Sequence, residues 1–255
     1  MCFELDSVPP IPAVSGGAPV RSEDVVLEAA DGTRLAAFSA QPDDGARVGI
    51  VILPDVRGLY RFYEELALRF AERGYAAVAF DYFGRTAGVA KRDDAFPYAD
   101  QVAQTTAATI QQDVGAAVAH LRSPEGGGCE VVFAVGFCYG GRHAWLSTAG
   151  GHGLAGAVGF YGSTGERNGE PGPTDRAAEL VGPILALQAG DDANILPEHN
   201  AAFDQALTAA GVEHEVVVYG GAPHSFFDRR QEDYAEQSGD AWKRTLAFIE
   251  HHTPA

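Results

Sequence analysis

A cysteine flanked by glycines lies where a buried strand would turn directly into a helix. Residues 136–141 read G-F-C-Y-G-G, which has the form G-x-C-x-G-G. A nucleophile on such a turn needs small residues two positions before it and two positions after it, because its backbone is strained and its neighbours crowd the turn. Gly136 and Gly140 meet this need. The pattern therefore predicts that Cys138 is a nucleophile.

The same turn would favour the reactive form of Cys138. Its thiol would lie at the N-terminal end of the following helix, where unpaired N–H groups and the helix dipole stabilise a thiolate. The N–H of Tyr139 would face an oxyanion that develops on a substrate carbonyl. The alternative is that Cys138 is a small apolar residue of the core, as free cysteines often are.

A nucleophile of this kind needs an acid and then a histidine, each on a loop after a later strand. An apolar stretch at 184–187 leads into Asp191 and Asp192, and a second one at 215–219 leads into a Gly-rich loop that contains His224. The carboxyl ends of strands are where α/β folds place their sites. The order therefore predicts His224 as the base and one of the two aspartates as the acid. The other seven histidines are expected at the surface.

These side chains together predict acyl transfer. His224 would accept the thiol proton, the aspartate would fix the histidine tautomer, and Cys138 would form a thioester that water hydrolyses. A second oxyanion donor is expected from the turn after the apolar stretch at 48–53, where the N–H of Val56 is the candidate.

Apolar, β-branched stretches alternate with segments of helical period through most of the chain. This alternation predicts a mainly parallel sheet with helices on both faces, and together with the elbow it predicts an α/β-hydrolase fold with about eight strands. Residues 25–29 and 34–38 are joined through Asp31-Gly32 and predict an antiparallel hairpin at one edge of the sheet. Further strands are expected at 48–53, 75–80, 130–135, 154–161, 184–187 and 215–219, and helices at 62–73, 105–121, 139–148, 198–210 and 234–251.

The whole chain, residues 1–255, is expected to form a single domain, because 46% of its residues are hydrophobic and no linker or repeat interrupts the pattern. Residues 1–20 form a Pro-rich N-terminal arm. The segment 84–99 lacks a clear period, and the segment 162–174 is polar and rich in Gly and Pro. We expect both to be loops that shape the pocket.

The chain carries 18 Lys and Arg against 35 Asp and Glu, a formal net charge of −17. Nucleic acid and membranes are therefore poor partners, and a small-molecule ester or lactone is expected instead, bound by a monomer or a small homo-oligomer. No stretch resembles a signal peptide or a membrane span. The three cysteines have neither disulfide nor zinc spacing, so we expect a reducing, cytoplasmic location, no metal and no organic cofactor.

The elbow, the acidic segment and the final H-x-F loop together resemble the dienelactone hydrolase family, the carboxymethylenebutenolidases, over nearly the whole chain after the arm. The resemblance is specific, because most other α/β-hydrolases carry serine at the elbow. It implies an esterase or lactonase, and it implies that the acid is Asp192 rather than Asp191. The alternatives are a family member specialised for another acyl compound and a non-catalytic protein of the same fold that binds a small ligand.

The resemblance also implies residues of the substrate pocket. Asp55 stands where family members related to the type enzyme carry a glutamate that contacts the resting thiol. Arg85 matches the first of two arginines that bind the carboxylate of the lactone acid, and Arg229 lies one residue after the position of the second. The resemblance further implies three aromatic side chains that line the pocket or lie near its mouth, namely Tyr161, Tyr82 and Phe83.

Overall fold

The structure is a computed structural model that describes residues 3–14, 17, 19–93, 95–228 and 232–255. Its centre is an eight-stranded sheet in the order β1-β2-β4-β3-β5-β6-β7-β8. Strands β3 to β8 run parallel to one another, whereas β2 pairs antiparallel with both β1 and β4. The strands are β1 (Val20–Glu28), β2 (Arg34–Pro42), β3 (Val48–Leu53), β4 (Ala76–Phe80), β5 (Val131–Phe137), β6 (Gly156–Phe160), β7 (Ile184–Ala189) and β8 (His214–Tyr219).

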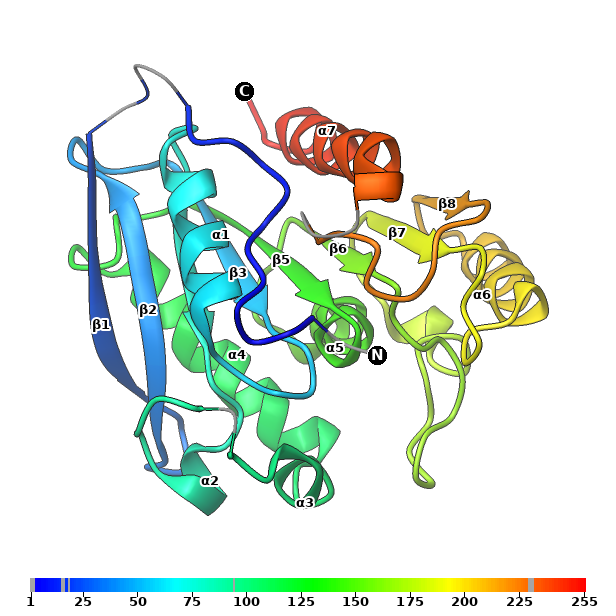
Figure 1. Ribbon diagram of the computed structural model, residues 1–255, viewed down its shortest axis with the longest axis horizontal. Helices are drawn as coiled ribbons and strands as arrows, with labels where there is room; N and C mark the ends of the chain where they lie inside the picture. Colours follow the sequence, from blue (N-terminus) through cyan, green and yellow to red (C-terminus); the bar gives the residue numbers. More distant parts are fainter. Residues whose placement is uncertain (1–2, 15–16, 18, 94, 229–231) are drawn as a thin grey trace.

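Helices cover both faces of this sheet (Figure 1). Alternate residues of β3 show why, since Ile50 and Ile52 belong to one apolar core and Val51 and Leu53 to the other. Helices α1 and α7 close the first core, and α4, α5 and α6 close the second. The α-helices are α1 (Arg61–Ala71), α2 (Gly84–Ala87), α3 (Tyr98–Val102), α4 (Ala107–Arg122), α5 (Tyr139–Ser147), α6 (Pro197–Ala210) and α7 (Ala235–His251).

The predicted α/β-hydrolase fold is confirmed, and the strands and long helices lie close to their predicted bounds. The edge hairpin is longer than predicted, because its register runs from Val20 paired with Pro42 to Glu28 paired with Arg34. Residues 21–24 of β1 are polar and exposed, as suits an edge strand, so the sequence there shows no apolar alternation.

The segment 84–99 was predicted to be a loop, and this prediction is wrong in part. It contains α2 and the start of α3. Helix α2 has only four residues, too few to show a helical period in the sequence. It begins at Gly84, where an added Cβ would lie 2.2 Å from the carbonyl oxygen of Arg34, so the chain passes close to β2.

Residues 3–14 of the N-terminal arm form no helix or strand but lie along α1 (Figure 1). At one end, the N–H of Val14 donates to the carboxylate of Glu72 just after α1, at 3.0 Å. At the other end, the ring of Phe3 stacks on Phe62 in the first turn of α1, with 4.0 Å between ring centroids. The arm thus follows α1 from its last turn to its first.

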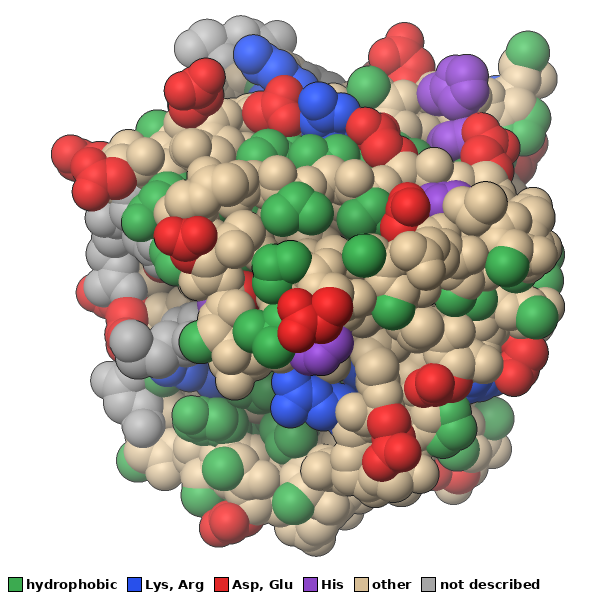
Figure 2. All heavy atoms as spheres, turned by 90° about the vertical axis from the view of Figure 1, so that its right-hand side faces the viewer, with side chains coloured by type: hydrophobic (Ala, Val, Ile, Leu, Met, Phe, Trp, Pro, Cys, Tyr) green, Lys and Arg blue, Asp and Glu red, His purple; other side chains and the backbone are tan. Residues whose placement is uncertain are grey.

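The surface carries the acidic excess of the sequence. Figure 2 shows acidic side chains spread singly over one face of the molecule, among basic and apolar ones. Among the described residues, no helix is both long and apolar enough to cross a membrane.

Candidate active site

Cys138 lies in a sharp turn between β5 and α5. Its φ of 55° and ψ of −111° are a combination that residues other than glycine rarely adopt. The glycines are required there, because a Cβ on Gly136 would lie 2.1 Å from the carbonyl oxygen of Gly140, and one on Gly140 would lie 2.0 Å from that of Leu53. The N–H of Cys138 donates to the carbonyl of Phe160 at 2.9 Å, which ties the turn to the end of β6.

Asp192 and His224 meet beyond the carboxyl ends of β7 and β8. Nδ1 of His224 lies 2.5 Å from Oδ2 of Asp192, and Oδ1 accepts the N–H groups of Asn194 and Ile195 at 2.8 Å and 3.2 Å. Burial of Asp192 disfavours its charge, but the hydrogen bond from His224 and those from the backbone outweigh burial and lower its pKa. An ionised Asp192 fixes the imidazole proton on Nδ1. The neighbouring Asp191 is exposed.

Cys138 and His224 line one pocket of about 570 Å³. Much of its wall comes from the segments 102–106 and 163–170. The predicted pocket loop 162–174 therefore contributes to the wall. No described residue of the other predicted pocket loop, 84–99, does so.

Val56 and Tyr139 also line this pocket. Tyr139 is the first residue of α5, so its N–H has no acceptor inside the helix. Val56 lies in the turn after β3, and among the described residues no acceptor takes its N–H. Both N–H groups are available to a substrate oxygen bound beside Cys138. The Tyr139 hydroxyl is bonded to Thr105 at 2.6 Å, and burial raises its pKa to about 12, so this side chain is a neutral wall.

Tyr161 lies at the pocket, as predicted, and packs against the histidine. Its ring centroid lies 5.0 Å from that of His224 and 5.5 Å from that of Phe226, which it meets edge-on. The side chain of Tyr161 is fully buried, and its N–H donates to Leu187 in β7 at 2.8 Å. The aromatic ring therefore supports one side of the imidazole.

Asp55 is buried and holds the turn that carries Val56. Its Oδ1 accepts the N–H of Arg57 at 2.9 Å, and its Oδ2 accepts the hydroxyl of Tyr60 at 2.9 Å. The N–H of Asp55 donates to the hydroxyl of Tyr63 at 2.8 Å. The Asp55 carboxylate thus bonds to groups of its own turn and of the start of α1.

Arg85 is not among the described residues that line the pocket, which contradicts its expected place there. Its guanidinium pairs with Asp31 at 2.8 Å and with Asp113 at 2.6 Å, and it donates to Gln112 at 3.2 Å. The unpredicted helix α2 carries Arg85 and directs its side chain toward α4 and the edge hairpin.

Tyr82 and Phe83 are buried in the core rather than placed at a pocket mouth. They follow β4, and their rings turn inward to pack with apolar side chains of the second core. The Tyr82 hydroxyl donates to the carbonyl of Pro54 at 2.7 Å, and its ring meets that of Tyr139 edge-on at 5.5 Å. Arg229 lies outside the described residues.

His143 and Arg167 line the pocket, although the sequence did not point to either. His143 was expected at the surface, but it is 2% exposed, and burial lowers its pKa to about 3, so its ring is neutral. Among the described residues, Nδ1 of His143 has no hydrogen-bond partner. Its spacing of four residues from Tyr139 was the available indication, since both then share one helix face. Arg167 donates to the hydroxyl of Ser163 at 3.1 Å, within a loop whose sequence has no period.

Arg142 of α5 holds this pocket loop. The buried guanidinium donates to the carbonyl oxygens of Glu170 at 3.1 Å and Pro171 at 3.0 Å, and also to those of Ser163 and Gly165. Because the Arg142 guanidinium donates to four backbone carbonyls, few of its N–H groups remain for a substrate.

A group of possible metal ligands lies elsewhere in the molecule. Among the described residues, ligand atoms of Glu213, His251 and His252 lie within 4.8 Å of one another. They line a groove at the amino ends of β7 and β8, whereas Cys138 lies at the carboxyl end of β5. This group is therefore separate from the pocket.

The sequence model of the dienelactone hydrolase family matches residues 35–253. A protein of Yersinia pestis that is provisionally named a carboxymethylenebutenolidase is 32% identical over 234 residues, which cover 87% of this chain and 85% of that protein. A carboxymethylenebutenolidase from Rhodococcus opacus is 29% identical over 262 residues, which cover 99% of this chain and 97% of that protein. A Klebsiella pneumoniae structure described as a provisional dienelactone hydrolase superposes with a TM-score of 0.79 at 28% identity, over 91% of this chain and 99% of that one.

Proposed function

The chain belongs to the dienelactone hydrolase family, and from that premise we propose that it hydrolyses a carboxylic ester or an enol-lactone through a triad of Cys138, His224 and Asp192. The observation that carries the proposal is the 2.5 Å pairing of Asp192 with His224 at a pocket that Cys138 also lines. The strained backbone of Cys138 supports it, since strain of this kind is typical of a nucleophile elbow.

In the first step, His224 takes the proton of Cys138 and the sulfur attacks the substrate carbonyl carbon. Asp192 accepts the Nδ1–H and stabilises the imidazolium that forms. The N–H groups of Val56 and Tyr139 stabilise the tetrahedral oxyanion. The bond from carbon to the leaving oxygen then breaks, the leaving group takes the proton from His224, and the acyl group remains on sulfur as a thioester.

In the second step, water hydrolyses the thioester. His224 removes a proton from the water, and the hydroxide attacks the thioester carbonyl. The same two N–H groups stabilise the second oxyanion. When the carbon–sulfur bond breaks, Cys138 recovers its proton from His224, and the carboxylic acid leaves.

The two described cysteines differ in a way that supports Cys138 as the nucleophile. Cys129 is buried, and burial raises its pKa to about 11, so it remains a neutral thiol. Cys138 is partly exposed to the pocket at the N-terminal end of α5, where the helix dipole favours a thiolate.

Replacing Cys138 with alanine tests the proposal. Cys138→Ala is expected to lower kcat/KM for p-nitrophenyl esters and for a dienelactone by about a thousandfold or more, because the covalent step is lost. Cys129→Ala is the matched control, since it removes a buried thiol and is expected to keep full activity. Turnover that survives Cys138→Ala contradicts the triad. A wild-type protein that binds these compounds but turns over none of them is instead a ligand-binding protein of this fold.

Arg167, rather than Arg85, lines the pocket and can pair with an anionic substrate there. Arg85 is paired with acids outside the pocket, and Arg142 is bonded to four carbonyls. Arg167→Gln is therefore expected to raise KM about tenfold for a carboxylate-bearing dienelactone, and less for a neutral aryl ester. Arg85→Gln is the control and is expected to leave the ratio of the two KM values unchanged. An equal rise in KM for both substrates in Arg167→Gln would contradict recognition of the substrate carboxylate by Arg167.

A hydrolase specialised for a different small acyl compound is the second candidate. One observation favours it: Arg85 is directed away from the pocket, toward Asp31 and Asp113. A panel of neutral esters and dienelactones separates the candidates, because a preference for neutral esters that Arg167→Gln leaves unchanged supports the second one. Either enzyme would work in a reducing, cytoplasmic setting, where the nucleophilic thiol stays reduced.

A further inference from the structure

The N-terminal arm is packed into the molecule at the level of the active site. Five of its described residues are buried: Pro9, and Phe3, Ser7, Val8 and Ile11 with exposures of 2%, 0%, 4% and 8%. The family match begins at residue 35, so the arm lies outside it. The family model therefore gives the arm no role, although the alignment with the Rhodococcus opacus protein extends into it.

One contact ties the arm to the loop that carries His224. The hydroxyl of Ser7 donates to the carboxylate of Asp228, four residues after His224, and both partners are buried. A buried carboxylate needs hydrogen-bond donors, because burial without them is costly. Phe226, between His224 and Asp228, belongs to the same apolar core as Phe3. The arm thus contacts this loop through both polar and apolar groups.

A second contact ties the arm to the turn that carries Val56. The guanidinium of Arg57, the residue after Val56, donates through Nη1 to the carbonyl oxygen of Phe3. The ring of Phe3 meets that of Tyr161 edge-on, with 6.1 Å between centroids, and Tyr161 packs against the imidazole of His224. A chain of contacts therefore runs from the arm to both the oxyanion donor and the base.

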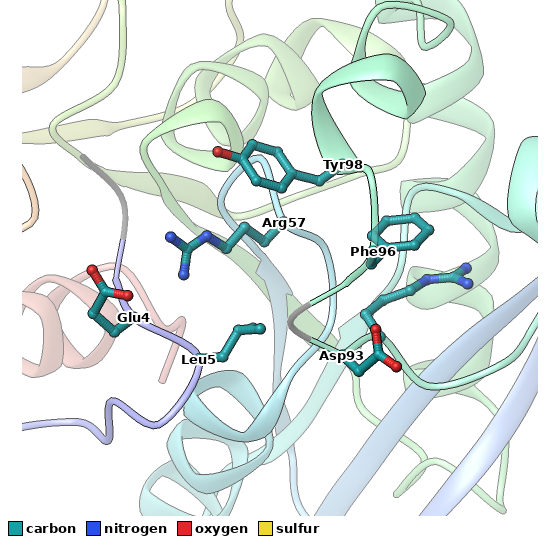
Figure 3. Close-up of a pocket in the computed structure, with 7 residues that line it drawn as sticks. Glu4, Leu5, Arg57, Asp93, Phe96 and Tyr98 are labelled. Atoms are coloured by element: carbon teal, nitrogen blue, oxygen red, sulfur yellow. The ribbon is translucent and has the colours of Figure 1, made fainter.

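A small cleft of about 170 Å³ marks where the arm faces the rest of the site (Figure 3). Glu4 and Leu5 lie on one side of it, Phe96 and Tyr98 lie on the other, and Arg57 lies between them. The guanidinium of Arg57 is 5.7 Å from the ring centroid of Tyr98, where α3 begins. Because α3 also contributes to the substrate pocket, the arm adjoins a third element of the site.

We propose that the N-terminal arm is a positioning element of the active site, in which Phe3 and Ser7 hold the Val56 turn and the His224 loop in fixed relation to each other. The inference rests on the proposed function, which gives these two segments the oxyanion donor and the base. In the sheet, β3 and β8 are separated by β5, β6 and β7. The arm connects the segments that follow β3 and β8 within five residues, Phe3 to Ser7.

Substitutions in the full-length chain test the proposal through a split between kcat and KM. Ser7→Ala and Phe3→Leu are each expected to lower kcat about tenfold while KM changes less than about twofold, because small displacements of catalytic groups slow the chemical step. Ile11→Ala is the matched control, since Ile11 is a buried arm residue of the apolar core. It is expected to lower the melting temperature and to keep kcat. Unchanged kcat in both Ser7→Ala and Phe3→Leu overturns the proposal, whatever happens to their melting temperatures.

A second readout needs no substrate. The Nδ1 proton of His224, bonded to Asp192 at 2.5 Å, is expected to give a downfield proton resonance. This resonance should shift or broaden in Ser7→Ala and stay in place in Ile11→Ala. An unchanged resonance in Ser7→Ala contradicts the positioning role. If the wild-type protein shows the resonance but hydrolyses no ester or lactone, the proposed function fails, and the effect of Ser7→Ala on the resonance still decides the role of the arm.

Discussion

Cys138 and His224, the proposed nucleophile and base, are positioned by contacts of different range. Cys138 is set by a turn whose critical neighbours, Gly136 and Gly140, lie within two residues of it. His224 is set by Asp192, 32 residues away along the chain, and its loop is bonded through Asp228 to a serine 221 residues away. Local steric requirements fix the first position, whereas long-range hydrogen bonds and ring contacts fix the second.

This difference has a consequence for mutation. In the elbow, the backbone geometry that places the nucleophile is also part of the packing between β3, β5 and α5, so stability and activity should fall together. In the loops of Asp192 and His224, a hydrogen bond can be removed while the strands beneath stay in place. Activity should then fall with little loss of stability.

The largest effect is expected for Gly140→Ala. The added Cβ would lie 2.0 Å from the carbonyl oxygen of Leu53, a distance that no rotamer can relieve, so β3 and α5 must move apart. We expect the free energy of unfolding, measured with urea, to fall by about 4 kcal/mol and hydrolysis to be lost. Gly239→Ala in α7 is the control, since its Cβ would meet nothing within 4 Å and alanine favours the helix. A stable, active Gly140→Ala protein would show that the elbow is not as crowded as its geometry indicates.

The next effect is expected for Asp192→Asn, which should separate activity from stability. The carboxamide no longer holds the His224 proton on Nδ1, and kcat should fall about a thousandfold with little change in melting temperature. Asp191→Asn is the matched control next to it in the chain, because the Asp191 side chain is exposed. Similar losses in the two variants would mean that the acid has been assigned incorrectly.

A smaller effect is expected for His143→Leu, which changes the pH dependence of stability. In the unfolded chain this histidine takes a proton below about pH 6.5, whereas in the folded chain burial keeps it neutral down to about pH 3. The unfolded state therefore binds more protons between these values, so stability falls as the pH is lowered through this window. At about pH 5 the wild-type protein should have lost about 2 kcal/mol through His143, and His143→Leu should not lose this amount. Parallel urea titrations at about pH 7 and about pH 5 measure the difference, with exposed His251→Leu as the control.

The features that could be predicted from the sequence are those with local causes. The alternation of apolar strands and helices gave the α/β-hydrolase fold, because parallel strands buried on both faces must be apolar along their length. The glycines around Cys138 indicated the turn, because the turn has no room for a side chain at these positions. The order of the strands also indicated that an aspartate after β7 and the histidine after β8 meet at one edge of the sheet, although their contact is long-range. The choice of Asp192 over Asp191 came from the family resemblance.

The remaining features depend on contacts that sequence spacing does not encode. Arg85 matched a family motif, but the single-turn helix α2 directs it to Asp31 and Asp113. His143 was expected at the surface, but α5 is buried on every side from Gly140 to Ser147, and a short segment rich in small residues does not show this in the sequence. The arm reads as a Pro-rich tail, and only the structure places Ser7 against Asp228.

Rapid quenching during turnover of a p-nitrophenyl ester, followed by mass spectrometry of the peptides, shows whether Cys138 carries the acyl group of the substrate. We expect an acyl adduct on the peptide that contains Cys138, which hydroxylamine removes as expected for a thioester, and no adduct in Cys138→Ala. Turnover without an adduct on Cys138, or an adduct on another residue that forms at the rate of turnover, would contradict the proposed role of Cys138.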